Sequence, residues 1–272
     1  MSPERYVAVE DRHGEPVGLA LVAPLGAARP RESRGGAMFY WLLKHIFIGP
    51  IFRLVFRPRV EGLENVPDGG PVILCGNHLS FIDSLLIPLA VKRKVVFLGK
   101  SDYFGKWYSW FFEGVGVIPV HREGGSRGES SLNAAVEQLA KGNIVAIYPE
   151  GTRSPDGRLY RGKTGPARMA LRARCPIVPV AVVDTDKALP SGRYAPKLVR
   201  VGARFGKPLD FSRYYGKDDD RFVLRSITDE LMYELMLLTG QEYVDEYASK
   251  FKNGPQPEEE KPGAGSSTPR AS

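Results

Sequence analysis

Cysteine is scarce in this sequence, and its scarcity excludes two kinds of protein. The 272 residues include two cysteines, Cys75 and Cys175, and each lies in an apolar stretch that is typical of a strand. Neither cysteine has the spacing of a metal-ligand set, and two thiols are too few for the disulfide framework of a small secreted domain. We therefore expect buried, reduced thiols in a cytoplasmic protein, and no metal centre.

The start of the chain does not resemble a secretion signal. It carries Glu4, Glu10 and Asp11, where a signal would have a basic segment followed by an apolar run. Residues 1–37 mix glycine, proline and charge, and the composition changes abruptly at Met38. We expect residues 1–37 to be a disordered extension and Met38 to be the natural start.

A long uninterrupted apolar run is also missing. Residues 38–60 are strongly apolar, but they contain Lys44 and Arg53 and are interrupted by Gly49-Pro50. A membrane-spanning helix needs about 20 mostly apolar residues, and proline breaks helical hydrogen bonding. We therefore expect two short helices that lie in the membrane interface, with their cations at the headgroups. The alternative is that they cover the protein core, since buried helices are equally apolar.

Acidic residues do not balance the basic ones. The net charge is +7, and the whole excess follows Met38, because residues 1–37 hold five basic and five acidic side chains. Between Met38 and Val60 there is no acidic residue, which suits an anionic membrane surface. Excess positive charge favours anionic partners, such as acidic lipid headgroups, phosphorylated substrates or nucleic acid. Because no nucleic-acid reading motif is present, we expect no nucleic-acid partner.

Short apolar runs alternate with helical patterns from residue 71 onward. This alternation predicts an α/β fold, with a largely parallel central sheet and helices on both faces. We expect this domain to span residues 61–250, before a disordered tail of residues 251–272 that is rich in Gly, Pro, Ser and Glu. The expected strands are Pro71–Gly76, Val95–Gly99, Val115–Val120, Ile144–Pro149, Ile177–Val183 and Leu198–Gly206. The expected helices are Ser84–Val91, Phe104–Glu113, Ser130–Lys141, Pro166–Ala173 and Asp219–Leu238.

The sharpest chemical signal follows the first expected strand. The run Gly76-Asn77-His78-Leu79-Ser80-Phe81-Ile82-Asp83 places a histidine at a strand end and a carboxylate at the start of the next helix. An imidazole can accept a hydroxyl proton at neutral pH, and a carboxylate fixes its tautomer. His78 and Asp83 are therefore a candidate base and its orienting partner. Taken alone the pattern is weak, since Ser80 and Asp83 also resemble a helix capping pair.

Two further strand ends carry an arginine. Gly116-Val117-Ile118-Pro119-Val120-His121-Arg122 ends the third strand, and Tyr148-Pro149-Glu150-Gly151-Thr152-Arg153-Ser154 ends the fourth. The planar fork of arginine matches phosphate oxygens in pairs, and a glycine lets the backbone approach a ligand. Ligands of such sheets bind beyond the carboxyl ends of the strands. Arg122 and Arg153 are therefore candidates for binding a phosphate near His78.

Taken in order, these motifs resemble the sequence blocks of the 1-acylglycerol-3-phosphate acyltransferases, within the phospholipid/glycerol acyltransferase superfamily. The four blocks match Asn77–Asp83, Gly116–Arg122, Glu150–Ser154 and Ile177–Val180. The resemblance implies transfer of a fatty acyl group to a lipid hydroxyl, with His78 as the base and Asp83 as its partner. It also implies that the glycerol phosphate of the acceptor is bound by residues that follow these strands: Arg122, Glu150, Gly151, Thr152, Arg153 and Lys100.

The resemblance further implies the reactants and the place of the reaction. The donor would be acyl-CoA or acyl carrier protein, the acceptor a lysophosphatidate-like lipid, and the product phosphatidate in phospholipid biosynthesis. No metal, cofactor or acyl-enzyme would be needed, because the acceptor supplies the attacking hydroxyl. The interfacial helices match the family's membrane-docking helical pair, so we expect a peripheral or monotopic protein at the cytoplasmic face of the cell membrane.

Two details bear on the acceptor. Lys163 lies in a stretch that looks like the family's basic-glycine segment, together with Arg161, Gly162 and Gly165. Pro119 and His121 depart from the second block of many relatives, which leaves the identity of the acceptor open.

The sequence leaves other functions open. Gly157-Arg158-Leu159-Tyr160-Arg161-Gly162-Lys163-Thr164 satisfies the P-loop pattern of nucleotide hydrolases, although a P-loop must run straight from a buried strand into a helix. A catalytically silent relative would only dock on membranes, but it need not retain both His78 and Asp83. With water in place of the lipid hydroxyl the chain would be a thioesterase. Other lyso-lipids and polar lipid alcohols are alternative acceptors.

Overall fold

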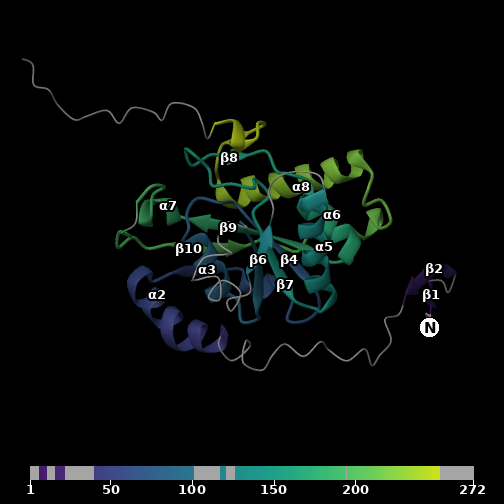
Figure 1. Cartoon of the computed structure of the whole chain (residues 1–272), viewed down its shortest axis with the longest axis horizontal. Coiled ribbons are helices and arrows are strands. Elements are labelled where there is room, and N and C mark those ends of the chain that lie inside the picture. The colour runs from purple at the N-terminus through teal and green to yellow at the C-terminus, as the bar shows by residue number, and fades with distance from the viewer. Residues whose placement is uncertain are drawn as a thin grey trace, which may run out of the picture.

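A seven-stranded sheet forms the centre of the molecule (Figure 1). The computed structural model describes residues 6–10, 16–21, 40–100, 117–120, 126–193 and 195–251. The strand order is β3-β10-β9-β4-β7-β5-β6. The strands are β3 (Arg59–Glu61), β4 (Val72–Gly76), β5 (Val95–Lys100), β6 (Val117–Val120), β7 (Ile144–Ile147), β9 (Ile177–Val183) and β10 (Gly202–Phe205).

Five neighbouring strands of this sheet run parallel, namely β9, β4, β7, β5 and β6. The other two run in the opposite direction, because β10 pairs antiparallel with β9 and parallel with β3. The expected α/β fold with a largely parallel sheet is therefore confirmed. Since β3 begins at Arg59, the sheet starts two residues before the expected boundary at residue 61.

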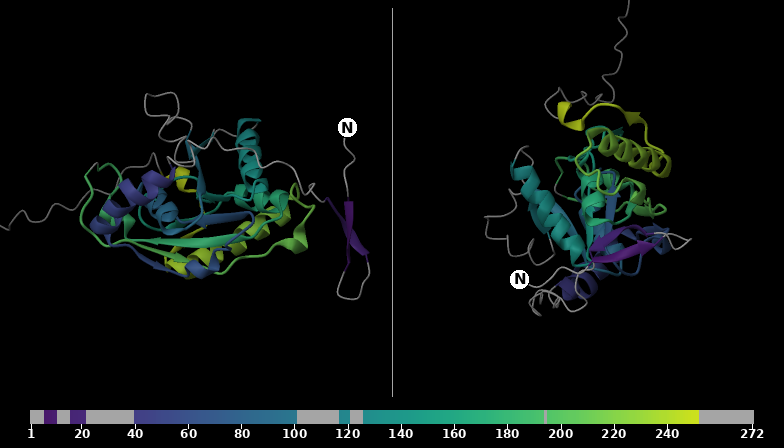
Figure 2. Two further views of the ribbon diagram at one scale, coloured as in Figure 1. Left: turned by 90° about the horizontal axis from the view of Figure 1, so that it is seen from below. Right: turned by 90° about the vertical axis from the view of Figure 1, so that its right-hand side faces the viewer.

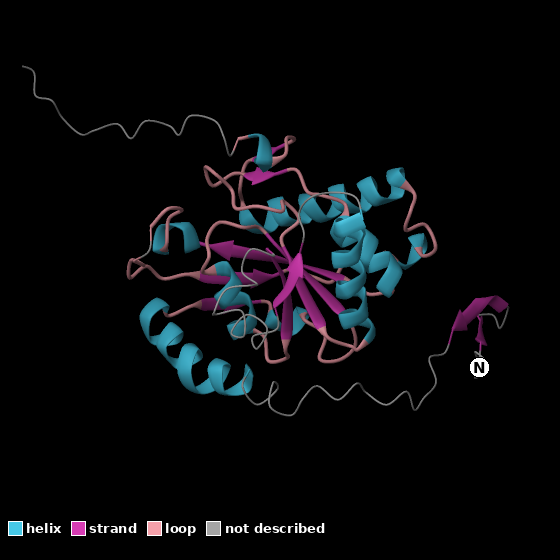
Figure 3. Ribbon diagram, viewed as in Figure 1, coloured by secondary structure: helices cyan, strands magenta, loops and turns pink. Residues whose placement is uncertain are grey.

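Helices cover both faces of the sheet (Figure 3). Side chains of β4 alternate between two cores: Val72 and Leu74 pack with α2 (Ile48–Phe56) and α3 (Asp83–Ala90), whereas Ile73 and Cys75 pack on the other side. That second core contains α5 (Ser126–Ala140), α6 (Gly165–Ala173) and α8 (Arg221–Thr239). Figure 2 shows the strands between α2 and α8. All five residues of β4 are buried, as a strand covered on both faces requires.

The expected helices match the observed ones where both are described. The helix expected over Asp219–Leu238 begins at Arg221, because the carboxylate of Asp220 caps it by accepting the N–H groups of Phe222 and Val223. The helix expected over Phe104–Glu113 lies outside the described residues. The strand expected over Leu198–Gly206 is shorter and runs against its neighbour β9.

The apolar N-terminal segment differs from the pair of helices expected there. Residues 40–56 are helical throughout, with a π-helical turn η1 (Leu43–Phe47) that leads directly into α2. Gly49 and Pro50 lie inside α2 and do not separate two helices. A Cβ at position 49 would lie 2.0 Å from the carbonyl oxygen of Lys44, so the wider π-turn depends on a glycine there. Of the described residues, none belongs to a helix that is both long enough and apolar enough to cross a membrane.

Within residues 1–37, the segment expected to be a disordered extension, the structure describes residues 6–10 and 16–21. The strands β1 (Tyr6–Glu10) and β2 (Pro16–Leu21) pair antiparallel as a hairpin. The physical reason is a run rich in β-formers, a short polar link that contains Gly14, and a second apolar run, which together are typical of a hairpin.

Short elements complete the fold. β8 (Leu159–Tyr160) and β11 (Tyr243–Val244) pair parallel as a separate two-stranded sheet. Further elements of the described residues are η2 (Leu63–Asn65), α7 (Thr185–Ala188), η4 (Ser212–Tyr214) and η5 (Ala248–Lys250).

Candidate active site

The predicted histidine and aspartate are in direct contact at the carboxyl end of β4. The Nδ1 atom of His78 lies 2.8 Å from Oδ2 of Asp83. Asp83 is the first residue of α3 and is completely buried, while the His78 side chain is 12% exposed. The same carboxylate oxygen accepts the backbone N–H groups of Leu79 at 2.7 Å and Ser80 at 2.8 Å. Asp83 therefore fixes both the imidazole and the turn that carries it.

The loop after β7 holds the backbone of His78 from the other side. The N–H of His78 donates to Oε1 of Glu150 at 3.2 Å, and its carbonyl accepts the N–H of Ser154 at 2.7 Å. The second oxygen of Glu150, Oε2, accepts the N–H of Tyr160 at 3.0 Å. Because β4 and β7 are parallel neighbours, the first and third sequence blocks leave the sheet side by side. This confirms the expectation that the two motifs meet at one edge.

Glu150, for which the resemblance implied a role in binding the acceptor, makes its hydrogen bonds within the protein. Its side chain is 2% exposed, and both carboxylate oxygens accept backbone N–H groups from within the protein. Burial raises the pKa of Glu150 to about 7, against the opposing effect of those two hydrogen bonds. A carboxylate in this position joins the two loops, and its role toward the acceptor stays a prediction.

Tyr148 is a residue of the site that the sequence analysis did not single out. Its ring stacks on the imidazole of His78, with centroids 3.9 Å apart and planes inclined by 5°. Its hydroxyl lies 3.3 Å from that of Ser84. Burial raises the pKa of Tyr148 well above its usual range, and the nearby Asp83 carboxylate adds to the rise, so the phenol is neutral. The signal that could have identified Tyr148 is the register between β4 and β7. Cys75 lies opposite Ile147 in that pairing, so the residues that follow each of them lie close together.

The phosphate-binding candidates surround the third block. Gly151 has a φ of +73°, and a Cβ there would lie 3.2 Å from both Cε and Nζ of Lys163. The amine of Lys163 therefore lies against the backbone of Gly151, the residue that directly precedes Thr152 and Arg153 in the chain. Arg153 is exposed, and the described part of the chain provides no ion-pair partner for it. Thr152 is 7% exposed, and its hydroxyl finds no hydrogen-bond partner among the described residues.

Two candidates cannot be placed in full. Arg122 lies outside the described residues. Lys100 is the last residue of β5, opposite Val120 of β6, so its backbone lies at the same carboxyl edge as the other motifs.

The P-loop alternative is contradicted by where the backbone N–H groups point. A P-loop needs its amides free to cradle phosphates. Here the N–H of Leu159 donates to the carbonyl of Glu242, that of Tyr160 to Glu150, and that of Lys163 to the carbonyl of Pro149. The segment forms β8 and a loop held to the rest of the fold, and it does not form a phosphate cradle.

Asn77, the first residue of the histidine motif, has a structural role. Its Oδ1 accepts the N–H of Val182 at 2.7 Å, and its Nδ2 donates to Oε1 of Gln241 at 2.8 Å. The end of β4 is thereby tied to β9 and to the segment after α8.

Comparisons with known proteins agree with the sequence blocks. The Acyltransferase family model matches residues 57–183. The chain is 31% identical over 167 residues to the 1-acyl-sn-glycerol-3-phosphate acyltransferase of Bacillus subtilis, which covers 59% of this chain and 79% of that protein. It is 30% identical over 200 residues to the protein of the same name from Salmonella typhimurium, which covers 71% of this chain and 76% of the relative.

Other relatives are longer or more distant. The chloroplastic 1-acyl-sn-glycerol-3-phosphate acyltransferase LPAT1 of Arabidopsis thaliana is 32% identical over 155 residues, or 54% of this chain and 43% of its own length. The chain thus spans less than half of that protein. The crystal structure of the 1-acyl-sn-glycerophosphate acyltransferase PlsC from Thermotoga maritima matches 73% of this chain and 88% of its own, with a TM-score of 0.54 and 21% identity, which supports the fold. With a histidine–aspartate pair at the end of β4 and relatives that it covers over most of their length, this chain belongs to the 1-acyl-sn-glycerol-3-phosphate acyltransferase family.

Proposed function

We propose that this chain transfers a fatty acyl group from a thioester donor to the free hydroxyl of 1-acylglycerol-3-phosphate, and so makes phosphatidate for phospholipid biosynthesis. The observation that carries the proposal is the 2.8 Å contact between Nδ1 of His78 and the buried Asp83 carboxylate, beside a loop that holds Arg153. Family membership supports the same reaction. The pair has the geometry of a base and its orienting partner, as in triads whose third member here is the substrate hydroxyl.

The proposed reaction begins with removal of a proton by His78. Because Asp83 accepts from Nδ1–H, the opposite nitrogen Nε2 carries the lone pair that takes the proton of the acceptor hydroxyl. The hydroxyl oxygen attacks the thioester carbonyl carbon, and the developing oxyanion collapses as the carbon–sulfur bond breaks. The leaving thiolate then takes the proton from the imidazolium, so that ester and free thiol are the products. Asp83 stabilises the imidazolium between these steps.

Cations beside the histidine are proposed to bind the phosphate of the acceptor. Arg153 is exposed in the loop after β7, and Lys163 lies against Gly151 of the same loop. An arginine fork and a lysine amine together suit a phosphomonoester. Arg122 and Lys100 belong to this group on the strength of the family resemblance. Glu150 supports the loop that carries these groups.

The donor is proposed to be acyl-CoA or acyl carrier protein, met at the cytoplasmic face of the membrane. Apolar side chains on the helical segment 40–56 support association with a bilayer, because Ile51 is 64% exposed and Leu54 is 74% exposed. They are joined by exposed Trp41, Ile46 and Phe47. An exposed apolar stripe with cations beside it is typical of a helix that lies in the interface.

Thiol release tests the proposal. Wild type and His78→Ala would be given a long-chain acyl-CoA with and without lysophosphatidate. We expect release that needs the acceptor, yields phosphatidate and is lost in the variant. Release without acceptor would instead identify a thioesterase, and no release with acyl-CoA or acyl carrier protein would favour a catalytically silent relative.

The phosphate site has its own test. Arg153→Gln should raise the KM for lysophosphatidate about ten-fold or more while the KM for the donor changes little, because charge-assisted hydrogen bonds to the phosphate are lost. Arg213→Gln, which removes an exposed arginine paired with Glu230, is the matched control. Equal effects of the two substitutions would count against the assignment.

A further inference from the structure

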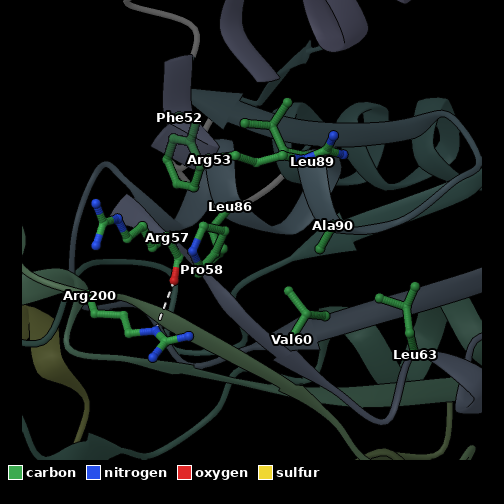
Figure 4. Close-up of a pocket in the computed structure, with 10 residues that line it drawn as sticks. All are labelled: Phe52, Arg53, Arg57, Pro58, Val60, Leu63, Leu86, Leu89, Ala90 and Arg200. Carbon is green, nitrogen blue, oxygen red and sulfur yellow. Dashed lines mark hydrogen bonds between the residues drawn. The ribbon is translucent and has the colours of Figure 1, made fainter. Parts of the chain in front are cut away.

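A cavity lies on the α2 side of the sheet, apart from the histidine and its loop. It has a volume of about 360 Å³ and is lined by residues of α2, β3, η2 and α3, together with Arg57, Pro58 and Arg200 (Figure 4). None of the residues discussed for the active site lines it. Its size is at the lower end of the range for small-molecule sites.

The lining of this cavity has two different parts. Three of the side chains are arginines, namely Arg53, Arg57 and Arg200. Most of the others are apolar and include Phe52, Val60, Leu63 and Leu86. Figure 4 shows Arg57 and Arg200 next to each other, with Val60 and Leu63 farther along the cavity. A site that is cationic in one part and apolar in another matches an amphiphile with an anionic head.

The charge of these arginines is not neutralised within the described protein. The described residues form no ion pair with any of the three, and Glu61, the nearest acid along the chain to Arg53 and Arg57, pairs with Arg59 at 2.6 Å and Arg204 at 3.4 Å. An exposed arginine is often only a solvated charge. Three around one apolar cavity, without an acidic side chain in its lining, create a field that attracts an anion.

The backbone at the end of α2 is also organised around the cavity. Arg57 caps the helix in the left-handed region with a φ of 43°, where glycine is the usual residue. A non-glycine residue in this backbone conformation costs about 1 kcal/mol of stability. The surrounding structure must therefore hold Arg57 in this conformation. Its carbonyl accepts Nε of Arg200 at 3.0 Å, so two cavity arginines are tied together. The helix-end carbonyls of Arg53 and Arg57 are thus occupied and do not face an incoming anion.

The position of the cavity favours a lipid over a soluble anion. Its arginine Arg53 lies on α2 between Ile51 and Leu54, which are 64% and 74% exposed. Phe52, from the same helix, is 4% exposed and forms part of the apolar wall. A bilayer that covers Ile51 and Leu54 would bring its phosphates to the level of Arg53.

We propose that this cavity binds one anionic phospholipid of the membrane, with its phosphate against Arg57 and Arg200 and the first carbons of an acyl chain along the apolar wall. The lipid is neither substrate nor product, and it fixes the enzyme on anionic bilayers in one orientation. The inference rests on the proposed association with membranes and is independent of the acyl-transfer chemistry.

The test uses a soluble anionic lipid that is not a product of the reaction. Dihexanoyl phosphatidylglycerol, below its micelle concentration, would be titrated into the full chain by calorimetry. We expect saturable binding of one lipid, and about ten-fold weaker binding by the double variant Arg57→Gln/Arg200→Gln, since two charge-assisted contacts are lost. Arg221→Gln is the matched control, because it removes one exposed charge at the start of α8, on the opposite face of the sheet.

A second variant tests the apolar part of the cavity without changing its charge. Ala90→Phe places a ring in the cavity, so we expect it to weaken lipid binding while circular dichroism shows an intact fold. If it does not fold, the double variant decides alone. Equal binding by wild type and the double variant would overturn the proposal. So would inorganic phosphate binding as tightly as the lipid, or neutral dihexanoyl phosphatidylcholine doing so.

The two proposals can fail separately. Lipid binding without thiol release would leave this inference standing and overturn the proposed reaction. Acceptor-dependent thiol release by a chain that does not bind the lipid would do the reverse.

Discussion

The imidazole of His78 is held by contacts of three kinds. Asp83 accepts from Nδ1, the ring of Tyr148 stacks on its face, and the backbone on both sides of the residue is bonded to the loop after β7. Each contact restricts the orientation of the ring before a substrate binds, so less conformational entropy is lost when the substrate binds. The histidine is thus oriented before the acceptor arrives.

The tautomer of this histidine depends on Asp83. We predict that Asp83→Asn lowers kcat by about 10³-fold or more with little change in KM, because a neutral amide neither fixes Nδ1–H nor stabilises the imidazolium. Steady-state kinetics would measure it. Ser80→Ala is the control, since it removes a neighbouring buried hydroxyl that bonds the carbonyl of Leu189 and does not contact the ring. A similar loss in both variants would mean that the turn, and not the tautomer, had been damaged.

The buried Glu150 makes stability depend on pH. Its pKa is about 7 in the folded protein and near 4.5 when exposed, so the folded state binds this proton more tightly than the unfolded chain. Its contribution to the free energy of unfolding is therefore present below about pH 4.5 and is lost as the pH rises through 7, by at most about 3 kcal/mol. Urea titrations from pH 5 to 8 should show this decline in wild type and a smaller one in Glu150→Gln. Equal slopes would contradict the prediction.

The contacts of Glu150 and Tyr148 could not be predicted from the sequence. The His78–Asp83 pair was predictable because its members are only five positions apart in the chain. Glu150 bonds residues that are 72 and 10 positions away, and Tyr148 reaches the histidine only through the pairing of β4 with β7. Composition and spacing carry no information about such pairings, so they could not predict the internal contacts of Glu150 or the place of Tyr148.

At the scale of elements, one lysine joins the apolar helical segment to the rest of the fold. Lys44 lies in η1 and is 7% exposed. Its Nζ donates to the carbonyl of Val91, and to those of Lys92 at 3.4 Å and Arg93 at 3.3 Å, which follow the end of α3. A cation at a helix C-terminus stabilises carbonyls that lack helical partners.

Replacing this lysine should loosen the helical segment. We predict that Lys44→Met lowers the free energy of unfolding by about 1–3 kcal/mol and speeds hydrogen exchange in residues 40–56, since buried carbonyls lose their donor. Lys92→Met, at an exposed lysine nearby, should change neither. If exchange in residues 40–56 stays as slow as in wild type, the lysine does not anchor the segment.

The burial of Lys44 should also make the stability of the protein depend on pH. Burial, with a smaller effect of Arg53, lowers the pKa of Lys44 to about 8 from 10.5. The unfolded chain therefore binds this proton more tightly between pH 8 and 10.5, so the free energy of unfolding should rise with pH in that window. Denaturant titrations at pH 8 and 10 should show the rise in wild type and its absence in Lys44→Met. A rise in both would assign it to another group.

Strands were predictable from the sequence where both of their faces are buried. The continuous apolar runs of β4 and β9 were located to within one residue, because strands covered on both faces show no polar interruption. The antiparallel direction of β10 was not predictable, since apolar runs do not encode direction. The helix across Gly49-Pro50 was missed because a proline normally ends a helix, and the π-turn that accommodates this pair has no local sequence signal.

At the scale of the whole molecule, the segment after α8 returns to the active-site edge. β11 pairs with β8, and Gln241 bonds Asn77 through Oε1 and the carbonyl of Gly157 through Nε2. The histidine motif and the P-loop-like segment are thereby joined by a residue 164 positions from the first. The motifs at the sheet edge were foreseeable from strand order, whereas the contacts of the segment after α8 were not.

Gln241 should therefore influence catalysis without contacting a substrate. We predict that Gln241→Ala lowers the free energy of unfolding by about 1 kcal/mol, because Nδ2 of the buried Asn77 keeps only its longer bond to the carbonyl of Val182, at 3.3 Å. It should also lower kcat several-fold while leaving the pH dependence of kcat unchanged, since the base itself is intact. Glu242→Ala is the matched control, because it removes a 73% exposed side chain whose pairing with Arg158 is 3.7 Å long. An unaltered kcat in Gln241→Ala would show that the segment after α8 stabilises the fold without positioning His78, and a shifted pH profile would place Gln241 in contact with the base.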